Sequence, residues 1–138
     1  MIEANDVNIT QLINTIKSYL VPNLLKSEYR EQNKSNPMYG HCYVATEALY
    51  HLLGEYRLNE TFKPFQAKDE NNISHWWLQN DVNEIIDITS DQYTSVGRLP
   101  PYINGRPRQF MFPSPSKRSR NVIESVKTIL VGFEALTG

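Results

Sequence analysis

The predicted fold is decided by two stretches, HCYVATEALYHLLG at positions 41–54 and SHWWLQNDVNEIIDIT at positions 74–89. In the first stretch, apolar residues recur at helical spacing and a glycine closes the pattern. This apolar stripe comprises Val44, Ala45, Ala48, Leu49, Leu52 and Leu53. Cys42 is therefore expected at or just before the first turn of a helix whose far side is buried. In the second stretch, runs 74–79 and 84–89 flank turn residues at 80–83, which predicts two antiparallel strands.

Two further helices are predicted toward the ends of the chain. Asn8 is placed to cap the first, with Gln11 reaching back toward the cap, and Pro22 ends or kinks this helix. Its apolar stripe comprises Ile9, Leu12, Ile13, Ile16, Tyr19 and Leu20. Ser116 is placed to cap the last helix, whose apolar positions run from 122 to 133. Residues 26–38 are polar and contain a proline, which predicts a loop or a short irregular helix.

Shorter strands complete the predicted fold. Residues 62–67 read as an edge strand, because Pro64 lacks the backbone N–H that a central strand uses. The chain beyond Ser90 is loop-like, and residues 109–112 could add one more strand. The order is helix, helix, antiparallel strands, helix. We therefore predict a single α+β domain over residues 1–138, with the cysteine-led helix packed on a sheet of about three to five strands.

Composition narrows the class of protein. The chain has 138 residues, a net charge of −1 and 40% hydrophobic residues, which excludes a disordered polymer and a collagen-like repeat. Its single cysteine excludes an internal disulfide framework and a cysteine-rich zinc module. No apolar run approaches the ~20 residues of a membrane span, and the first six residues do not resemble a signal peptide. A soluble, cytoplasmic protein is expected.

The spacing of His75 and Asp87 places them on one face of the predicted hairpin. Their positions sum to 162, which centres the turn at residue 81, within 80–83. In that register they are direct cross-strand neighbours, with Cβ atoms about 4.5–5.5 Å apart. A slip of one residue would instead place them on opposite faces of the sheet.

Cys42 completes a predicted set of catalytic residues. The positive end of a helix dipole favours a thiolate at the helix N-terminus. An imidazole beside that thiolate and a carboxylate on the other ring nitrogen then supply the base and its positioning group. Cys42, His75 and Asp87 fit these three roles. An oxyanion could be held by backbone amides around Cys42, with a side-chain donor from Asn36, Gln32 or Tyr39.

Each of these residues also has a purely structural interpretation. A lone cysteine is commonly a small buried apolar residue, and a histidine beside two tryptophans commonly lies at a sheet surface. A carboxylate flanked by isoleucines is harder to explain in this way, because a buried carboxylate needs a partner. A zinc site built from His41, Cys42, His75 and Asp87 lacks recognisable ligand spacing. We therefore predict neither a metal nor a cofactor.

Three short segments resemble known proteins. Gly-His-Cys opening a helix at 40–42, His75-Trp76, and Asp87 resemble the papain/transglutaminase-like superfamily. More narrowly, GHCYVAT at 40–46, SHWW at 74–77 and IDITSDQY at 86–93 resemble small YunG-like bacterial and phage proteins, over about residues 37–123. That family usually has Gln at the position of His41 and commonly a small residue at that of Tyr43. The resemblance implies a papain-like core. We expect oxyanion or substrate-binding roles for His41, Asn36, Trp76, Trp77 and Gln92.

A basic segment stands apart from these motifs. Residues 92–123 carry six cations and no acid, so this segment has a charge of +6 and the remaining residues sum to −7. Arg118 and Arg120 fall in the first turns of the last helix, where the dipole disfavours cations by ~0.3–1 kcal/mol each. An anion at this helix N-terminus, or an acidic patch elsewhere in the chain, would compensate. We favour internal pairing with the corner at 90–92. A sequence pI of 6.3 argues against nucleic-acid binding.

Two functions follow from these observations. The first is a small cysteine hydrolase or acyltransferase that acts on an amide, isopeptide or thioester bond of a peptide, protein or small substrate. The second is a catalytically silent papain-like module that binds a peptide or anionic ligand through Trp76, Trp77 and the basic segment. Because so short a chain offers little wall for a cleft, a large partner or a second copy could complete the site.

Overall fold

The computed structural model of the chain describes residues 7–20, 40–58 and 61–137, with side chains up to residue 131. These residues form an α+β fold with a four-stranded antiparallel sheet. The helices are α1 (Ile9–Ser18), α3 (Cys42–Glu55), α4 (Asp91–Thr94) and α5 (Lys117–Thr137), with a 3-10 turn η3 (Tyr102–Asn104). The strands are β1 (Lys63–Lys68), β2 (Ser74–Gln79), β3 (Ile85–Ile86) and β4 (Arg106–Pro107), in the order β3-β2-β1-β4.

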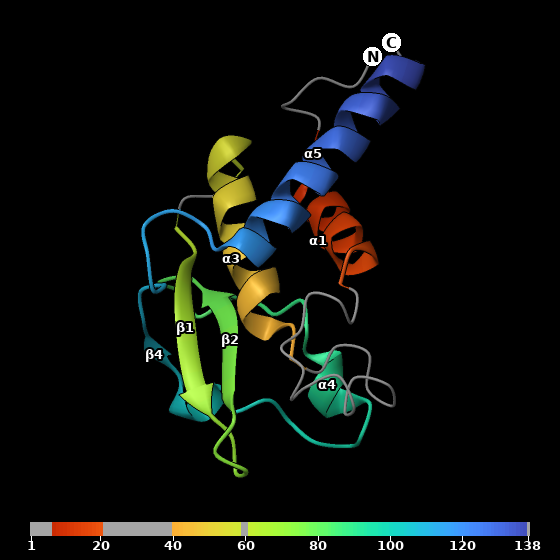
Figure 1. The fold of residues 1–138 in the computed structure, drawn as a ribbon. Helices are drawn as coiled ribbons and strands as arrows, with labels where there is room; N and C mark the ends of the chain where they lie inside the picture. The colour runs from red at the N-terminus through yellow and green to blue at the C-terminus, as the bar shows by residue number, and fades with distance from the viewer. Residues whose placement is uncertain (1–6, 21–39, 59–60, 138) are drawn as a thin grey trace.

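The core lies where α3 meets the other long helices and the sheet. Helix α3 contacts α1, α5, β1 and β2, so it is the central element of the domain (Figure 1). Its buried residues include Ala45, Ala48, Leu49, Leu52 and Leu53, which are the apolar stripe expected from the sequence. The core continues into α1 through Leu12 and Ile16, into α5 through Val122, Ile123, Val126 and Leu130, and into the sheet region through Leu78 and Ile88. Burial of this stripe fixes the position of Cys42 at the start of α3.

The predicted caps of the outer helices are confirmed. Asn8 precedes α1, and its side chain accepts a hydrogen bond from the Gln11 backbone N–H at 2.8 Å. Ser116 precedes α5, and its hydroxyl accepts from the Ser119 backbone N–H at 3.3 Å. The predicted segment at 26–38 and the break at Pro22 lie outside the described residues.

The register between β2 and β3 differs from the prediction by two residues. Leu78 pairs with Ile86, so paired positions sum to 164 rather than 162. The turn is longer than expected, because the Asn80 side chain accepts from the Val82 and Glu84 backbone N–H groups and Asn83 adopts a φ of 63°. A slip of two residues keeps every side chain on its predicted face, whereas a slip of one would not.

The sheet departs from the prediction at β1 as well. Strand β1 is not an edge, because β4 pairs with it through Phe65 and Gln66. Pro64 is compatible with this position, since its carbonyl accepts from the Arg108 backbone N–H at 3.0 Å and no N–H is required of it. The added strand is therefore β4, and no strand covers 109–112. Strand β3 stops at Ile86, and residues predicted to be loop after Ser90 form α4 and η3.

Gly105 packs closely against Trp77 of β2 because it lacks a side chain. A Cβ at this position would lie 2.4 Å from Cζ2 of Trp77, a fully buried ring. Its φ of −64° and ψ of 139° suit any residue, so the need for glycine here is purely steric.

Gly105→Ala should therefore destabilise the domain by about 1–3 kcal/mol, because Trp77 must move within a packed core. Gly54→Ala is the matched control, since nothing lies within 4 Å of a Cβ there and alanine favours the helix by ~0.5–1 kcal/mol. Urea unfolding of both variants measures the two effects. Equal stability of the two variants would contradict the close packing of Gly105 on Trp77.

Candidate active site

The thiol of Cys42 lies at the start of α3, beside the first residue of β2. Cys42 is the first helical residue, and its Sγ is 3.5 Å from the Ser74 carbonyl oxygen. The first α-helical hydrogen bond runs from the Ala45 N–H to the His41 carbonyl, so the N–H groups at positions 42–44 precede the ladder of the helix. The thiol is thus next to His75 and at the positive end of the helix dipole.

His75 and Asp87 form a short hydrogen bond in the interior of the domain. Nε2 of His75 is 2.6 Å from Oδ2 of Asp87, and the side chains are 0% and 3% exposed. Oδ2 also accepts from the Tyr102 hydroxyl at 2.7 Å, while Oδ1 accepts from the Thr89 N–H at 3.2 Å. Three donors therefore hold the carboxylate in one orientation, which satisfies a buried charge.

The predicted meeting of His75 and Asp87 is confirmed, although not as direct cross-strand neighbours. In the observed register, position 87 lies beyond the end of β3 and opposite Trp77. His75 and Asp87 are therefore diagonal neighbours on one face, a spacing that long and aromatic side chains can bridge.

Aromatic rings fix the orientation of the imidazole. The Trp77 ring stacks beside His75 at a centroid distance of 5.8 Å, and Tyr93 meets it edge-on at 4.9 Å. Tyr102 in turn meets Trp77 at 5.1 Å and reaches Asp87 with its hydroxyl. Two aromatic rings thus contact the ring of His75 and restrict its orientation.

The protonation of His75 follows from these partners. Burial by itself lowers the pKa of His75, but the hydrogen bonds and negative charge of Asp87 and Cys42 outweigh it and raise the pKa to about 9. Nε2 faces Asp87, and the buried Nδ1 has no hydrogen-bond partner among the described residues. The Cys42 side chain lies near the imidazole, since it contributes to the raised pKa of His75. Cys42, His75 and Asp87 are therefore close to one another in the fold.

His41 is buried at the N-cap position of α3, adjacent to Cys42. Its side chain is 0% exposed, and neither ring nitrogen has a hydrogen-bond partner in the part of the chain that the structure describes. Burial lowers its pKa to about 4, so the imidazole is neutral at pH 7 and retains one N–H donor. His41 therefore satisfies the chemical requirement for the oxyanion role expected of it.

The tryptophans do not form the exposed binding surface that the sequence suggested. Trp76 and Trp77 are 8% and 0% exposed, and because they are successive residues of a strand they face opposite sides of the sheet. Trp77 supports His75, whereas Trp76 packs against Tyr43 and Phe110 on the other side. Both were expected to contact substrate; their burial makes them supports of the fold instead.

The other expected binding residues have different outcomes. Gln92 is buried in α4, at 5% exposure, next to Tyr93. Asn36, Gln32 and Tyr39 lie outside the described residues.

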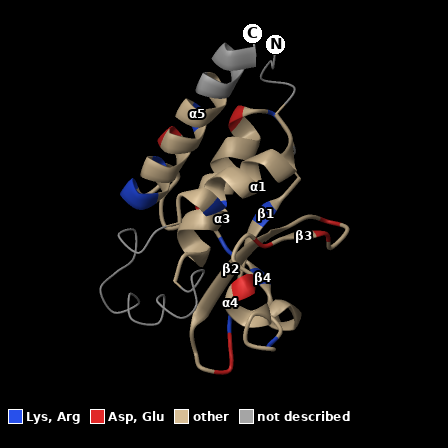
Figure 2. Cartoon of the chain, turned by 90° about the vertical axis from the view of Figure 1, so that its right-hand side faces the viewer, with Lys and Arg blue, Asp and Glu red and all other residues tan. Residues whose placement is uncertain are grey.

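The basic residues of α5 do not pair with the corner at 90–92. Asp91 lies 3.9 Å from Lys17 instead, and Arg120 donates to the Pro115 carbonyl at 3.4 Å. Neither Arg118 nor Arg120 forms an ion pair with any described residue. The expected internal pairing is therefore wrong. Figure 2 shows the cations at the start of α5, away from α4.

The acid at the N-terminus of α5 is Glu47. This residue of α3 is 1% exposed, and its Oε1 accepts from the Ser116 N–H at 2.9 Å while Oε2 accepts from the Tyr43 hydroxyl at 3.2 Å. A carboxylate at a helix N-terminus is favoured by the dipole and offsets the cations in the first turns. The cations at the start of α5 are thus compensated from within the chain, as expected, but by Glu47 and not by the corner at 90–92.

Sequence reasoning missed three residues of this region. Tyr102 and Tyr93 surround the pair of His75 and Asp87, and Glu47 anchors α5. Tyr102 and Tyr93 lie in a segment read as loop, and Glu47 occupies a helical position whose contact is 69 residues away. Of these three residues, only Glu47 could have been noticed in the sequence. It is an acid on the buried side of the α3 stripe, and a buried acid requires a partner.

Comparison with family models, curated proteins and solved structures returns no match for this chain. Within the described ranges, no group of three or more His, Cys, Asp and Glu side chains is arranged to hold a metal ion. No helix in the same ranges is long and apolar enough to cross a bilayer.

The pair of His75 and Asp87 should make stability depend on alkaline pH. The pKa of His75 is about 9 in the folded chain against about 6.5 for a free histidine, so the folded state binds the proton more tightly. This contribution is complete below pH 6.5 and is lost as the pH rises through about 9. We expect the free energy of unfolding, measured in urea, to fall over this range.

Asp87→Asn should flatten this decline, because an amide cannot stabilise the imidazolium. Asp91→Asn is the control, because Asp91 is exposed and its ion pair with Lys17, at 3.9 Å, is a weak surface contact. A decline of equal slope in wild type and Asp87→Asn would contradict the role given to this pair.

His41 should act in the opposite direction, on the acid side. Its pKa of about 4 in the folded chain is below that of a free histidine, so its contribution is present above pH 6.5 and is lost as the pH falls toward 4. His41→Leu replaces a buried imidazole by an apolar side chain and should stabilise the chain by about 1–3 kcal/mol at neutral pH. Urea unfolding should show this gain increasing as the pH falls. A variant that is less stable than wild type throughout would show that the imidazole has a stabilising partner.

Proposed function

We propose that the chain is a small cysteine hydrolase or acyltransferase in which Cys42 is the nucleophile, His75 the general base and Asp87 the positioning residue. The observation that supports this most directly is the buried 2.6 Å hydrogen bond between His75 and Asp87, with Cys42 near the same imidazole. A buried acid, a buried histidine and a thiol at one point are costly to maintain for packing alone. They are the groups that thiol catalysis requires.

Because the pKa of His75 is about 9, the ring is protonated at neutral pH, and the reactive state is an ion pair of the Cys42 thiolate and the His75 imidazolium. Asp87 holds Nε2–H and stabilises the imidazolium, which keeps the proton on Nδ1 for the leaving group. The thiolate attacks the carbonyl carbon of an amide, isopeptide or thioester. A tetrahedral intermediate with a negatively charged oxygen results.

The N-terminus of α3 is suited to hold that oxygen. The backbone N–H groups at 42–44 precede the hydrogen-bond ladder of the helix, and they stand at the positive end of its dipole. His41 is neutral and adjacent, so its remaining N–H can add a donor. In the related proteins that the sequence resembles, glutamine commonly occupies this position, and we propose that His41 replaces it.

Collapse of the intermediate breaks the bond to the leaving group, which takes the proton from His75. Cys42 is then a thioester of the substrate acyl group. Water or an amine attacks this thioester with His75 again as base, releases a carboxylic acid or an amide, and restores the thiol. This series of reaction steps needs no metal and no cofactor. We propose a papain/transglutaminase-like core, of the kind found in YunG-like proteins, as the fold that carries it.

One observation favours a catalytically silent binding module as the second candidate. Cys42 is 6% exposed and His75 is 0% exposed, so very little of either residue is accessible to a substrate. An inert thiol is expected if the groups serve only to hold the fold together. The two candidates differ in the reactivity of Cys42.

Alkylation of Cys42 at low pH separates them. If His75 and the helix dipole stabilise a thiolate, iodoacetamide should modify Cys42 at pH 6 at a rate close to that at pH 8, unlike a free thiol with its pKa of about 8.5. His75→Ala should reduce the rate at pH 6 by at least about tenfold and restore the steep pH dependence of an ordinary thiol. Intact mass measures the modification, and the chain contains a single cysteine.

Two variants refine this test. Asp87→Asn should give an intermediate rate, because the amide favours the wrong tautomer. His51→Ala, on the same helix, should leave the rate unchanged. A wild-type rate that titrates like a free thiol, or no modification of folded protein, would favour the silent module and exclude thiol catalysis.

A further inference from the structure

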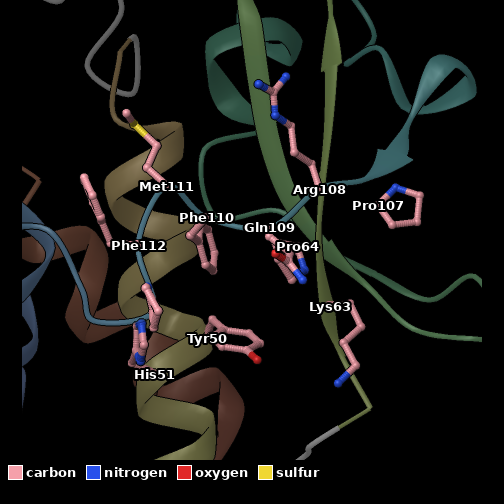
Figure 3. A pocket seen from close by; sticks show the side chains of 11 residues that line it. Tyr50, His51, Lys63, Pro64, Pro107, Arg108, Gln109, Phe110, Met111 and Phe112 are labelled. Carbon is pink, nitrogen blue, oxygen red and sulfur yellow. The ribbon is translucent and has the colours of Figure 1, made fainter.

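A cavity lies beside α3, separate from the candidate active site. It has a volume of about 740 Å³ and is bounded by α3, β1 and the segment 107–113 that follows β4. Figure 3 shows Tyr50 and His51 of α3 on one side, Lys63 and Pro64 of β1 on the other, and Phe110 between them. Ligand cavities in proteins commonly have ~300–1,000 Å³, so this volume fits a small molecule.

The segment that covers this cavity is fastened to α3. The Met111 N–H donates to the Tyr43 hydroxyl at 3.1 Å, and the Phe110 ring contacts those of Tyr43, Tyr50 and Trp76 at 5.5 to 5.6 Å. These contacts hold the wall in place without a ligand. The cavity is therefore formed in advance, and its walls consist mainly of aromatic and proline rings.

The polar groups of the cavity are suited to an anion. Lys63 and Tyr50 point toward one another in Figure 3, while Arg108 is directed away from them, to Gln66 at 3.2 Å. The lining contains no aspartate or glutamate. Neither the Lys63 ammonium nor the Tyr50 hydroxyl has a hydrogen-bond or ion-pair partner among the described residues.

Lys63 and Tyr50 are therefore two polar groups at this cavity that the fold itself does not use. His51 also lines the cavity, but its Nε2 is covered and has no partner in the part of the chain that the structure describes. It is therefore not counted as a contact for a ligand in the cavity.

The alternation of β2 separates this cavity from the thiol. Trp76 faces Phe110 on the cavity side, whereas His75 faces Trp77 and Asp87 on the other. Tyr50 follows Cys42 by eight residues, which is about 12 Å along a helix. Occupancy of the cavity and chemistry at Cys42 can therefore be measured independently.

We propose that this cavity binds a small carboxylate with a flat apolar body. The carboxylate lies between the Lys63 ammonium and the Tyr50 hydroxyl, and the apolar body lies against Phe110 and the proline rings. An aromatic acid pairs with the Lys63 ammonium, accepts from the Tyr50 hydroxyl and packs its ring against the flat walls. A neutral analogue of the same shape fills the cavity but leaves the cation without a partner.

The test uses 2-naphthoate as probe and 2-naphthamide as its neutral analogue. Titration of the ¹⁵N-labelled chain should give saturable amide shifts at Tyr50, Phe110 and Met111. We expect naphthoate to bind about five- to tenfold more tightly than naphthamide, since a charge-assisted contact to an exposed lysine contributes modestly. Lys63→Gln should remove this preference and leave naphthamide binding unchanged.

Lys68→Gln is the matched control, because Lys68 lies on the same strand, exposed and outside the cavity. It should retain the preference for naphthoate. The proposal is overturned if naphthoate binds Lys63→Gln as tightly as wild type, if no saturable shifts occur at the lining, or if the shifts centre on positions 42 and 75. It is also overturned if these amides shift with protein concentration alone, which would assign the face to a second copy of the chain.

Discussion

The hydrogen bond between His75 and Asp87 is the interaction on which the site and this end of the sheet both depend. Strand β3 has only two residues, so the ladder that joins it to β2 ends at Ile86. Immediately beyond, the 2.6 Å bond from the imidazole to the carboxylate takes over the connection. Loss of one partner from a buried pair of this kind commonly costs ~3–5 kcal/mol. The same contact therefore secures the chain and orients the imidazole.

Support for this pair comes from segments that are distant in sequence. Tyr102 donates to the same carboxylate oxygen as His75, and it also packs against Trp77. Trp77 stacks beside His75 and fills the space that Gly105 leaves open. The result is a continuous packing of ring on ring behind the imidazole. If His75 is the base that we propose, its position is already fixed before a reaction begins, which is the advantage of a site built on strands.

The sequence predicted the parts of this arrangement that depend on periodicity. The stripe of α3 and the alternation of β2 place Cys42 at a helix start and put His75 and Asp87 on one face. The exact register could not be predicted, because it depends on how the Asn80 side chain folds the turn, but an error of two residues preserves the face. Tyr102 and the contact from Glu47 to Ser116 join segments far apart in the chain, and no local pattern encodes them.

The alternation of β2 also explains how one short strand can serve two separate places. His75 and Trp77 face the Asp87 carboxylate, whereas Trp76 faces the aromatic rings beside the cavity on α3. Because Trp76 is covalently next to His75 and packed on both Tyr43 and Phe110, movement of the covering segment is resisted by the same strand that carries His75. Rigid packing of this kind transmits strain rather than absorbing it. The two faces of β2 thus carry different side chains, but the peptide bond between His75 and Trp76 links them directly.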